Sequence, residues 1–230
     1  MCANQIVNGV TKDGGFAEYE ILHTSAAVRI PAGIDPAKAA PLLCAGVTVF
    51  ASIRKQHTPP GSTVVVVGLG GLGHLAVQYA AKMGYHVVAI SSSSSKASFA
   101  HQLGAHDYID TSKQDLVETL NAMGGAALIV YTAPSPKLLP SLLNTFQPAG
   151  KLLVLSPCGD FPVSSAILIQ KGVSVTGYAT GTALDNEEAI AFAERHGVEC
   201  LIEKFPLAEA QKALEHTKSG NVRFRSVLVM

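Results

Sequence analysis

The chain has 230 residues, a length that suits one large domain or one domain with part of a second. Hydrophobic residues make up 48% of it and charged residues 15%, which is enough apolar material for a buried core and excludes a disordered chain. The 17 basic and 17 acidic residues cancel to zero net charge, which disfavours a nucleic-acid-binding protein, and 6% aromatic residues without tryptophan disfavour a stacking platform.

The sequence carries no pattern typical of a membrane span or a targeting signal. Its longest apolar candidate, residues 64–77, is interrupted by glycines and by His74, and the first residues have neither a basic flank nor an apolar signal core. The four scattered cysteines form no CxxC pair, as expected of reduced thiols. We therefore expect a cytoplasmic protein that binds neither membranes nor nucleic acid.

The first elements in chain order have strand character. Residues 15–22 and 26–31 predict two short antiparallel strands, and residues 36–55 predict a helix that follows them. At the other end of the chain, residues 223–229 predict a further strand. We interpret the terminal strands as one small β lobe assembled from both ends of the chain.

Strand and helix patterns alternate between these ends. The expected strands are residues 63–67, 86–90, 107–110, 127–131, 151–155 and 173–178. The expected helices are residues 74–83, 96–103, 116–123, 137–146 and 187–196. Parallel strands need crossover helices, so this alternation predicts an α/β fold with a doubly wound, parallel, six-stranded Rossmann sheet.

A glycine-rich turn, G-L-G-G-L-G, separates the first of these strands from its helix. This setting is that of the dinucleotide-binding fingerprint. Gly68 would allow the tight turn, Gly70 would let the backbone approach a pyrophosphate, and Gly73 would let the helix pack closely on the strand. The N-terminus of the helix would direct free N–H groups at the phosphates. The alternative is a glycine-rich turn that binds no ligand.

The loop after the second strand indicates which dinucleotide binds. An acidic residue at this point would bind the ribose 2′-hydroxyl of NAD. Here the strand ends at Ile90 and continues into five serines and Lys96. A carboxylate would repel a 2′-phosphate, whereas hydroxyls and an ammonium group would bind one. The loop therefore favours NADP(H), the alternative being a solvated serine loop.

Five segments together carry a family resemblance: residues 14–19, 42–49, 68–74, 91–96 and 222–228. With them the chain resembles the zinc-type medium-chain alcohol dehydrogenases, most closely the cinnamyl-alcohol-dehydrogenase-like branch. The resemblance implies an NADP-binding Rossmann domain at residues 36–196. Residues 1–35 would be a remnant of the family's GroES-like catalytic lobe, and residues 197–230 a segment returning to it. The family resemblance also implies a homodimer joined through the sheet edge from Val173 to Ala179.

The zinc chemistry of that family is not expected here. The resemblance matches Cys44 to the third ligand of the catalytic zinc and Cys2 to the last cysteine of a structural zinc site. We expect the other ligands, which family members carry on a long N-terminal lobe, to be missing. Tetrahedral zinc needs three or four protein ligands, so one thiolate does not make a site.

The resemblance also assigns cofactor contacts. Thr48, one helical turn after Cys44, would touch the nicotinamide ribose, and Arg225 would contact the pyrophosphate. The residues expected to bind the cofactor are Thr48, Gly68, Gly70, Gly71, Leu72, Gly73, Ser91, Ser92, Ser93, Lys96, Thr132, Ala133, Ser156, Tyr178 and Arg225. Thr48, Ser156 and Tyr178 are in addition the catalytic candidates, since their hydroxyls could stabilise a developing oxyanion. His74 we expect to serve in helix packing.

These expectations lead to one main hypothesis and two alternatives. The main hypothesis is an NADPH-dependent, zinc-independent reductase acting on an activated carbonyl or alkene, because hydride transfer is the cofactor's own chemistry. The first alternative is a non-catalytic NADP-binding module. The second is a non-redox enzyme, an isomerase or cyclase, that reuses the dehydrogenase cleft.

Overall fold

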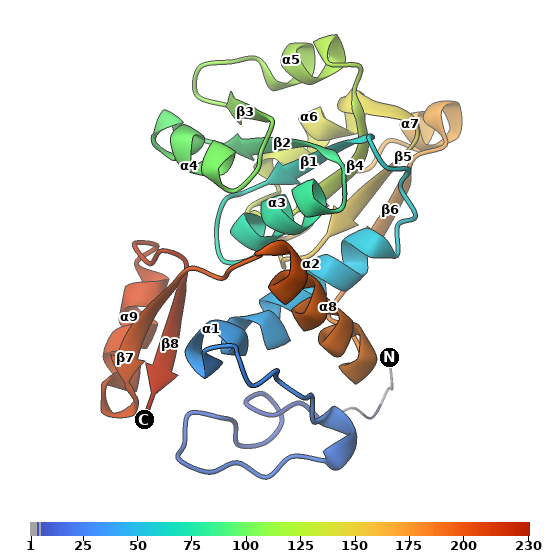
Figure 1. Cartoon of the computed structure of the whole chain (residues 1–230). Coiled ribbons are helices and arrows are strands. Elements are labelled where there is room, and N and C mark those ends of the chain that lie inside the picture. The colour runs from blue at the N-terminus through green and yellow to red at the C-terminus, as the bar shows by residue number, and fades with distance from the viewer. Residues whose placement is uncertain (1–3, 5) are drawn as a thin grey trace.

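A computed structural model of the chain describes residue 4 and residues 6–230, so Cys2 lies outside the described residues. It shows a parallel six-stranded sheet with helices on both faces, and a separate two-stranded sheet near the C-terminus (Figure 1). The strands of the large sheet lie in the order β3-β2-β1-β4-β5-β6. The predicted doubly wound Rossmann-type fold is confirmed, with its first strand at the centre.

The strands of the large sheet are buried runs of apolar residues. They are β1 (Thr63–Val67), β2 (His86–Ser91), β3 (Asp107–Asp110), β4 (Ala126–Tyr131), β5 (Phe146–Val154) and β6 (Ser174–Gly177). Val67 at the end of β1 pairs with Ile90 on one side and Tyr131 on the other. The carboxyl ends of β1, β2 and β4 are therefore level, and the loops that follow them meet at one edge of the sheet.

Helices cover both faces of this sheet. The helices of the described chain are α1 (Pro36–Ala39), α2 (Ala45–Arg54), α3 (Gly73–Lys82), α4 (Ala97–Gln102), α5 (Leu116–Ala122), α6 (Leu139–Leu142), α7 (Ser165–Lys171), α8 (Ala183–His196) and α9 (Ala210–Lys218). Of these, α1 and α9 contact the small sheet near the C-terminus. Val64 and Val66 pack into one apolar cluster with residues of α2, α3 and α8, while Val65 and Val67 pack into a second cluster on the opposite face. Burial on both faces explains the unbroken valine run.

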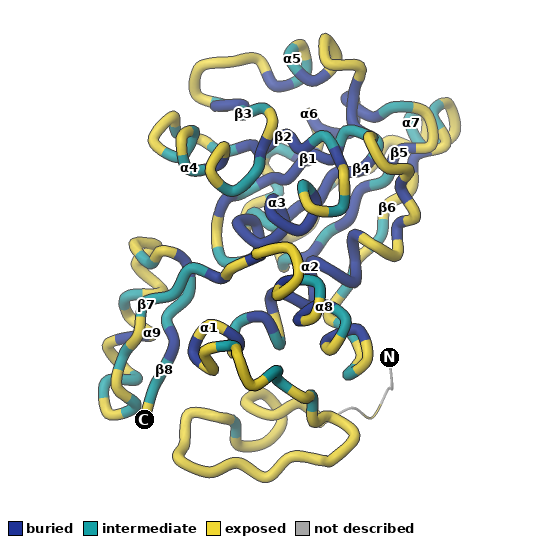
Figure 2. Tube along the Cα trace, viewed as in Figure 1, coloured by how far each residue is buried: buried dark blue, intermediate teal, exposed yellow. Residues whose placement is uncertain are grey.

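The small β lobe differs from the prediction. Residues 15–22 and 26–31 are not strands, and the N-terminal segment, including a 3-10 turn, η1 (Thr24–Ala26), is mostly exposed (Figure 2). Tyr19 and Ile21 are 90% and 88% exposed. A strand needs a partner for its backbone groups, and β8 (Arg225–Val229) pairs instead with β7 (Ile202–Pro206), which was not predicted.

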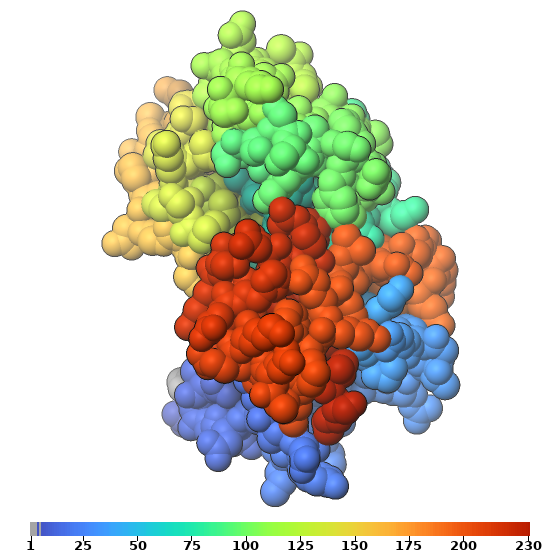
Figure 3. All heavy atoms as spheres, turned by 90° about the vertical axis from the view of Figure 1, so that its left-hand side faces the viewer, coloured from blue at the N-terminus to red at the C-terminus, as the bar shows by residue number. Residues whose placement is uncertain are grey.

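The lobe is therefore built from the C-terminal end alone. Helix α9 packs against β8 and β7, and this C-terminal unit lies between the N-terminal segment and the large sheet (Figure 3). The two expected N-terminal strands were wrong, and the expected C-terminal strand is confirmed. The domain boundaries at residues 35 and 196 stay a prediction.

The single helix predicted for residues 36–55 is also corrected. It divides into α1, a 3-10 turn η2 (Ala40–Leu43) and α2, with a bend of 49° between Pro36–Leu43 and Ala45–Arg54. Pro41 has no N–H to continue an α-helix, and Cys44 has a non-helical backbone (φ −122°, ψ −71°). The bend places Cys44 at the junction.

The helix predicted for residues 137–146 is likewise divided around Pro136 and Pro140. It forms η4 (Pro136–Leu138), α6 and η5 (Leu143–Thr145), and β5 starts at Phe146. In the described part of the chain, no single helix is long and apolar enough to cross a membrane. The bent pair Pro36–Leu43 and Ala45–Arg54 meets that test on combined length and composition alone.

Candidate functional site

The glycine turn leaves one open position between two tightly packed ones. Gly68 has φ +92°, and a β carbon there would lie 3.1 Å from the Ala133 nitrogen. A β carbon on Gly73 would lie 1.7 Å from the Gly68 oxygen. At Gly70, by contrast, no described atom lies within 4 Å of that position. The backbone is thus open to a ligand at Gly70, next to the first turn of α3, whose N-cap Leu72 makes no side-chain capping bond among the described residues.

Arg225 and Thr132 connect distant parts of the chain to this turn. The Thr132 hydroxyl donates to the Val67 oxygen at 2.9 Å and to the Gly68 oxygen at 3.0 Å. Arg225 Nε donates to the Gly71 oxygen at 3.3 Å. A β carbon on Gly71 would lie only 2.5 Å from that nitrogen, so glycine permits the close approach. A fixed guanidinium beside an open backbone turn is suited to binding a phosphate or pyrophosphate.

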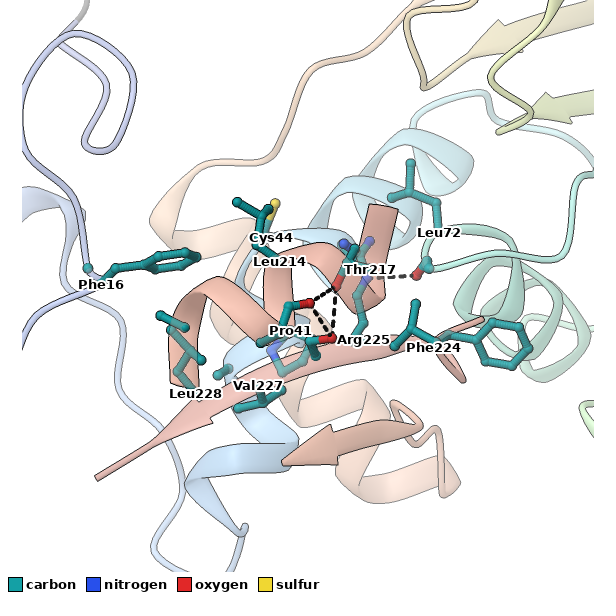
Figure 4. A pocket seen from close by; sticks show the side chains of 18 of the residues that line it. Phe16, Pro41, Cys44, Leu72, Leu214, Thr217, Phe224, Arg225, Val227 and Leu228 are labelled. Carbon is teal, nitrogen blue, oxygen red and sulfur yellow. Dashed lines mark hydrogen bonds between the residues drawn. The ribbon is translucent and has the colours of Figure 1, made fainter. Parts of the chain in front are cut away.

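A cavity of about 680 Å³ opens beside Arg225, between the glycine turn, the α1–α2 junction and the C-terminal unit (Figure 4). It brings together five residues that the sequence singled out: Cys44, Gly71, Leu72, Thr132 and Arg225. Its other walls are mainly apolar and include Phe16, Pro41, Leu214, Phe224, Val227 and Leu228. The cavity therefore pairs a cationic end at the turn with an apolar body, a composition typical of small-molecule sites.

None of the three predicted catalytic hydroxyls belongs to the described residues that line this cavity. Thr48 is buried, and its hydroxyl donates to the Ala179 oxygen at 3.4 Å. The Tyr178 hydroxyl accepts a hydrogen bond of 2.6 Å from Lys55 Nζ. Ser156 is half-buried just after β5. The catalytic roles of these three residues stay predictions, and so do the predicted contacts with the cofactor.

The serine loop is ordered by its own hydrogen bonds. Ser93 caps η3 (Ser94–Lys96), while Ser92 is exposed. Lys96 Nζ donates to the Leu69 oxygen at 3.2 Å, which brings the ammonium group next to the glycine turn. Burial lowers the pKa of Lys96, and the positive charge of nearby Arg223 lowers it further. Arg223 is a second cation at this loop, and no sequence motif predicted it.

One acidic residue also lies beside the loop. Asp110 ends β3 opposite Ser91, and its carboxylate accepts hydrogen bonds from Ser94 and from the backbone and side chain of Ser112. The hydrogen bonds from Ser112 and Ser94 hold the pKa of Asp110 below its ordinary value. Both oxygens of the carboxylate therefore accept hydrogen bonds from this part of the chain, and Asp110 helps to order the loop.

His74 is a packing residue, as expected. Its ring is fully buried and stacks on Phe224 at a centroid distance of 4.7 Å. Nδ1 donates to the Gly70 oxygen at 3.0 Å, and Nε2 accepts from the Leu201 nitrogen at 3.3 Å. Both nitrogens are satisfied in the neutral ring, and burial lowers the pKa of His74 to about 4.

This buried neutral ring predicts a loss of stability in mild acid. The pKa of His74 rises to its ordinary value of 6.5 on unfolding, so the unfolded chain takes up the proton first as pH falls. The neutral His74 ring therefore makes its full contribution to stability above pH 6.5. As the pH falls to 4, the free energy of unfolding decreases by roughly 3 kcal/mol. Between pH 7 and pH 5, urea unfolding should show about 2 kcal/mol of this loss in wild type and in a control variant of exposed His101, His101→Gln, but much less in His74→Gln. Equal pH dependence in all three would contradict it.

The described residues do not fit a catalytic zinc ion. Across residue 4 and residues 6–230, no group of three or more His, Cys, Asp or Glu side chains is placed to hold a metal. Cys44 is a free, exposed thiol at the cavity wall. A tetrahedral protein site requires more ligands than this single thiolate.

The zinc-binding dehydrogenase family matches residues 71–195, more than half of the chain. The chain belongs to this family. An alcohol dehydrogenase, patD, from Penicillium expansum is 51% identical over the whole chain, which spans 68% of that relative. An alcohol dehydrogenase from Geobacillus stearothermophilus is 35% identical over 99% of the chain and 68% of its own length. The expected resemblance to medium-chain alcohol dehydrogenases is thus confirmed.

Solved dehydrogenase structures share the fold. The Aeropyrum pernix alcohol dehydrogenase superposes with a TM-score of 0.90 at 27% identity, over all of this chain and 69% of that one. The cinnamyl alcohol dehydrogenase SbCAD4 from Sorghum bicolor has a TM-score of 0.78 at 32% identity, over 87% of this chain and 57% of its own. The CAD from Helicobacter pylori complexed with NADP(H) has a TM-score of 0.75 at 25% identity, over 87% and 57%. The chain therefore spans little more than half of some relatives and about two thirds of others.

Proposed function

We propose that the chain is an NADPH-dependent oxidoreductase that reduces an activated carbonyl or alkene without zinc. The observation that carries this proposal is the junction at Arg225, where a guanidinium beside an open glycine turn meets a largely apolar cavity. The guanidinium would neutralise a pyrophosphate, and the apolar walls would receive an uncharged substrate and exclude water. The bound cofactor would supply the hydride.

Two cations at the serine loop support NADPH over NADH. Lys96 and Arg223 lie close enough for the charge of one to lower the pKa of the other, and Ser92 beside them is exposed. Two positive charges that repel each other are stabilised by a dianion such as a 2′-phosphate. The Helicobacter pylori relative, which binds NADP(H), adds support by family membership.

The direct test is a titration of NADPH fluorescence followed by a panel of aldehydes, enones and quinones. We expect saturable binding, tighter for NADPH than for NADH, and oxidation of NADPH by the most electrophilic compounds. Binding without turnover of any compound would favour the non-catalytic module. Product formation without a change in NADPH absorbance would favour the isomerase or cyclase, and absence of NADPH binding would overturn both the reductase and the NADP-binding module.

The zinc-independent part of the proposal predicts the outcome of metal analysis. Cys44 belongs to no group of three or more His, Cys, Asp or Glu side chains among the described residues, so a zinc ion would be held weakly. We expect clearly substoichiometric zinc in purified protein, and a folded Cys44→Ala variant whose NADPH affinity is close to wild type. Stoichiometric zinc that disappears in Cys44→Ala would contradict the proposal.

We further propose that the chain forms a homodimer through β6. This strand pairs with β5 and is the outer strand of the described sheet, with Val175 39% exposed and Ile169 of the adjacent α7 82% exposed. An open apolar edge favours pairing with another strand. We expect light scattering to give a dimer, and Val175→Lys to give a folded monomer. A wild-type monomer at micromolar concentration would contradict the dimer.

A further inference from the structure

The loop that leaves the carboxyl end of β6, residues 178–182, is held between two helices. From α2, the Thr48 hydroxyl donates to the Ala179 oxygen at 3.4 Å. At Gly181, a β carbon would lie 2.3 Å from Val47 Cγ2 of α2 and 2.7 Å from Asp185 Cβ of α8. The backbone of this loop, called here the β6 loop, thus fills the space between α2 and α8 with no room for a side chain at Gly181.

Asp185 is the residue on which the β6 loop depends most. Its Oδ2 atom accepts hydrogen bonds from the Thr182 nitrogen at 2.8 Å, the Thr182 hydroxyl at 2.8 Å and Lys55 Nζ at 2.9 Å. The Thr182 hydroxyl in turn accepts from the Asp185 nitrogen at 3.2 Å, completing a capping box at the start of α8. The Asp185 side chain is only 8% exposed, so its carboxylate is shielded from water, whereas the Lys55 side chain is 40% exposed.

Lys55 extends this network to the first residue of the loop. The same ammonium group that pairs with Asp185 donates to the Tyr178 hydroxyl at 2.6 Å. The hydrogen bond from the Thr182 backbone, with those from Lys55 and the Thr182 hydroxyl, lowers the pKa of Asp185 to about 2, and the bonds to Tyr178 and Asp185 raise the pKa of Lys55. The pair is therefore ionised throughout the neutral range.

We propose that Asp185 is a positioning residue, which fixes both ends of the β6 loop so that the loop can receive the nicotinamide end of the cofactor. Ligands of doubly wound sheets bind at the carboxyl ends of the strands, and this loop begins at such an end. The inference rests on the proposed function, because it takes NADPH as the ligand. Asp185 itself touches neither cofactor nor substrate; it acts through Thr182, Lys55 and Tyr178.

The chain offers a matched control for this role. Arg54 and Glu188 form a second ion pair between α2 and α8, next in sequence to Lys55 and one helical turn beyond Asp185. Neither member bonds to the β6 loop in the described structure. Glu188→Gln therefore removes a negative charge from α8 without changing any bond to the β6 loop. Asp185→Asn removes a negative charge from the same helix at the residue that holds the β6 loop.

The experiment compares two ligands, NADPH and 2′-phospho-ADP-ribose, which lacks the nicotinamide. In Asp185→Asn we expect NADPH to bind about tenfold more weakly, and 2′-phospho-ADP-ribose to bind within about twofold of wild type, because only the nicotinamide end loses its preorganised contact. Turnover should fall by about tenfold or more for the same reason. Glu188→Gln should leave both affinities and turnover unchanged.

Hydrogen exchange without any ligand provides an independent measurement. Amides of residues 178–182 should exchange faster in Asp185→Asn and in Lys55→Gln, which keeps the capping box, but not in Glu188→Gln. Equal weakening of both ligands, unchanged NADPH affinity in Asp185→Asn, or the same loss in Glu188→Gln would overturn the positioning role. If the wild-type protein binds neither NADPH nor 2′-phospho-ADP-ribose, the proposed function is overturned. The hydrogen-exchange comparison would still test whether Asp185 holds the β6 loop. If Asp185→Asn fails to fold, Lys55→Gln serves for the ligand comparison, with the same outcomes deciding.

Discussion

Gly73→Ala should lose about 3 kcal/mol of its free energy of unfolding, which is the upper end of the roughly 1–3 kcal/mol that overpacking typically costs. The new β carbon would lie 1.7 Å from the Gly68 oxygen, a backbone atom that the Thr132 hydroxyl holds at 3.0 Å. Neither the turn nor the start of α3 can move aside without breaking the βαβ unit. Thermal melting should show a decrease of about 6–12 °C or failure to fold.

Gly70→Ala is the matched control for the same turn. No described atom lies within 4 Å of a β carbon at Gly70, so the melting temperature should stay close to wild type. NADPH affinity should nevertheless fall, since the methyl group would occupy the space proposed for the pyrophosphate. A stable Gly73→Ala variant would contradict the packing argument, and undiminished NADPH affinity in Gly70→Ala would contradict the pyrophosphate site.

The double variant Ser92→Asp, Lys96→Ala should reverse the cofactor preference. It removes one cation and adds a carboxylate where the 2′-phosphate of NADPH would bind. A lost charge-assisted hydrogen bond costs about 1.5–3 kcal/mol, so NADPH affinity should fall by about tenfold to a hundredfold. NADH affinity should hold or rise, because a carboxylate can accept from the ribose 2′-hydroxyl.

Fluorescence titration with both cofactors measures this reversal. Lys82→Ala, at an exposed lysine at the end of α3, is the control for loss of a lysine elsewhere on the surface and should leave both affinities unchanged. Arg223→Ala should weaken NADPH but not NADH, because Arg223 is the second cation of the loop. If the double variant still prefers NADPH, the interpretation of the serine loop is wrong.

The sequence alone determined the large sheet and the glycine turn. An unbroken valine run at residues 64–67 can be satisfied only by burial on both faces, which requires a central parallel strand with helices on each side. The spacing of Gly68, Gly70 and Gly73 between that strand and a helix likewise specified the turn. The last long helix was predicted to start at residue 187, but it starts at Ala183, because Thr182 and Asp185 form a capping box that was not predicted.

Only the tertiary structure decided which partners the remaining segments find. The alternating pattern at residues 15–22 is that of a strand, yet a strand forms only where another edge accepts its backbone groups, and β8 pairs with β7 instead. Arg225 meets Gly71, and Lys55 meets Asp185, across more than a hundred residues of sequence. Such contacts produce no local pattern in the sequence, because they depend on how the folded helices and strands pack together and not on the preferences of neighbouring residues.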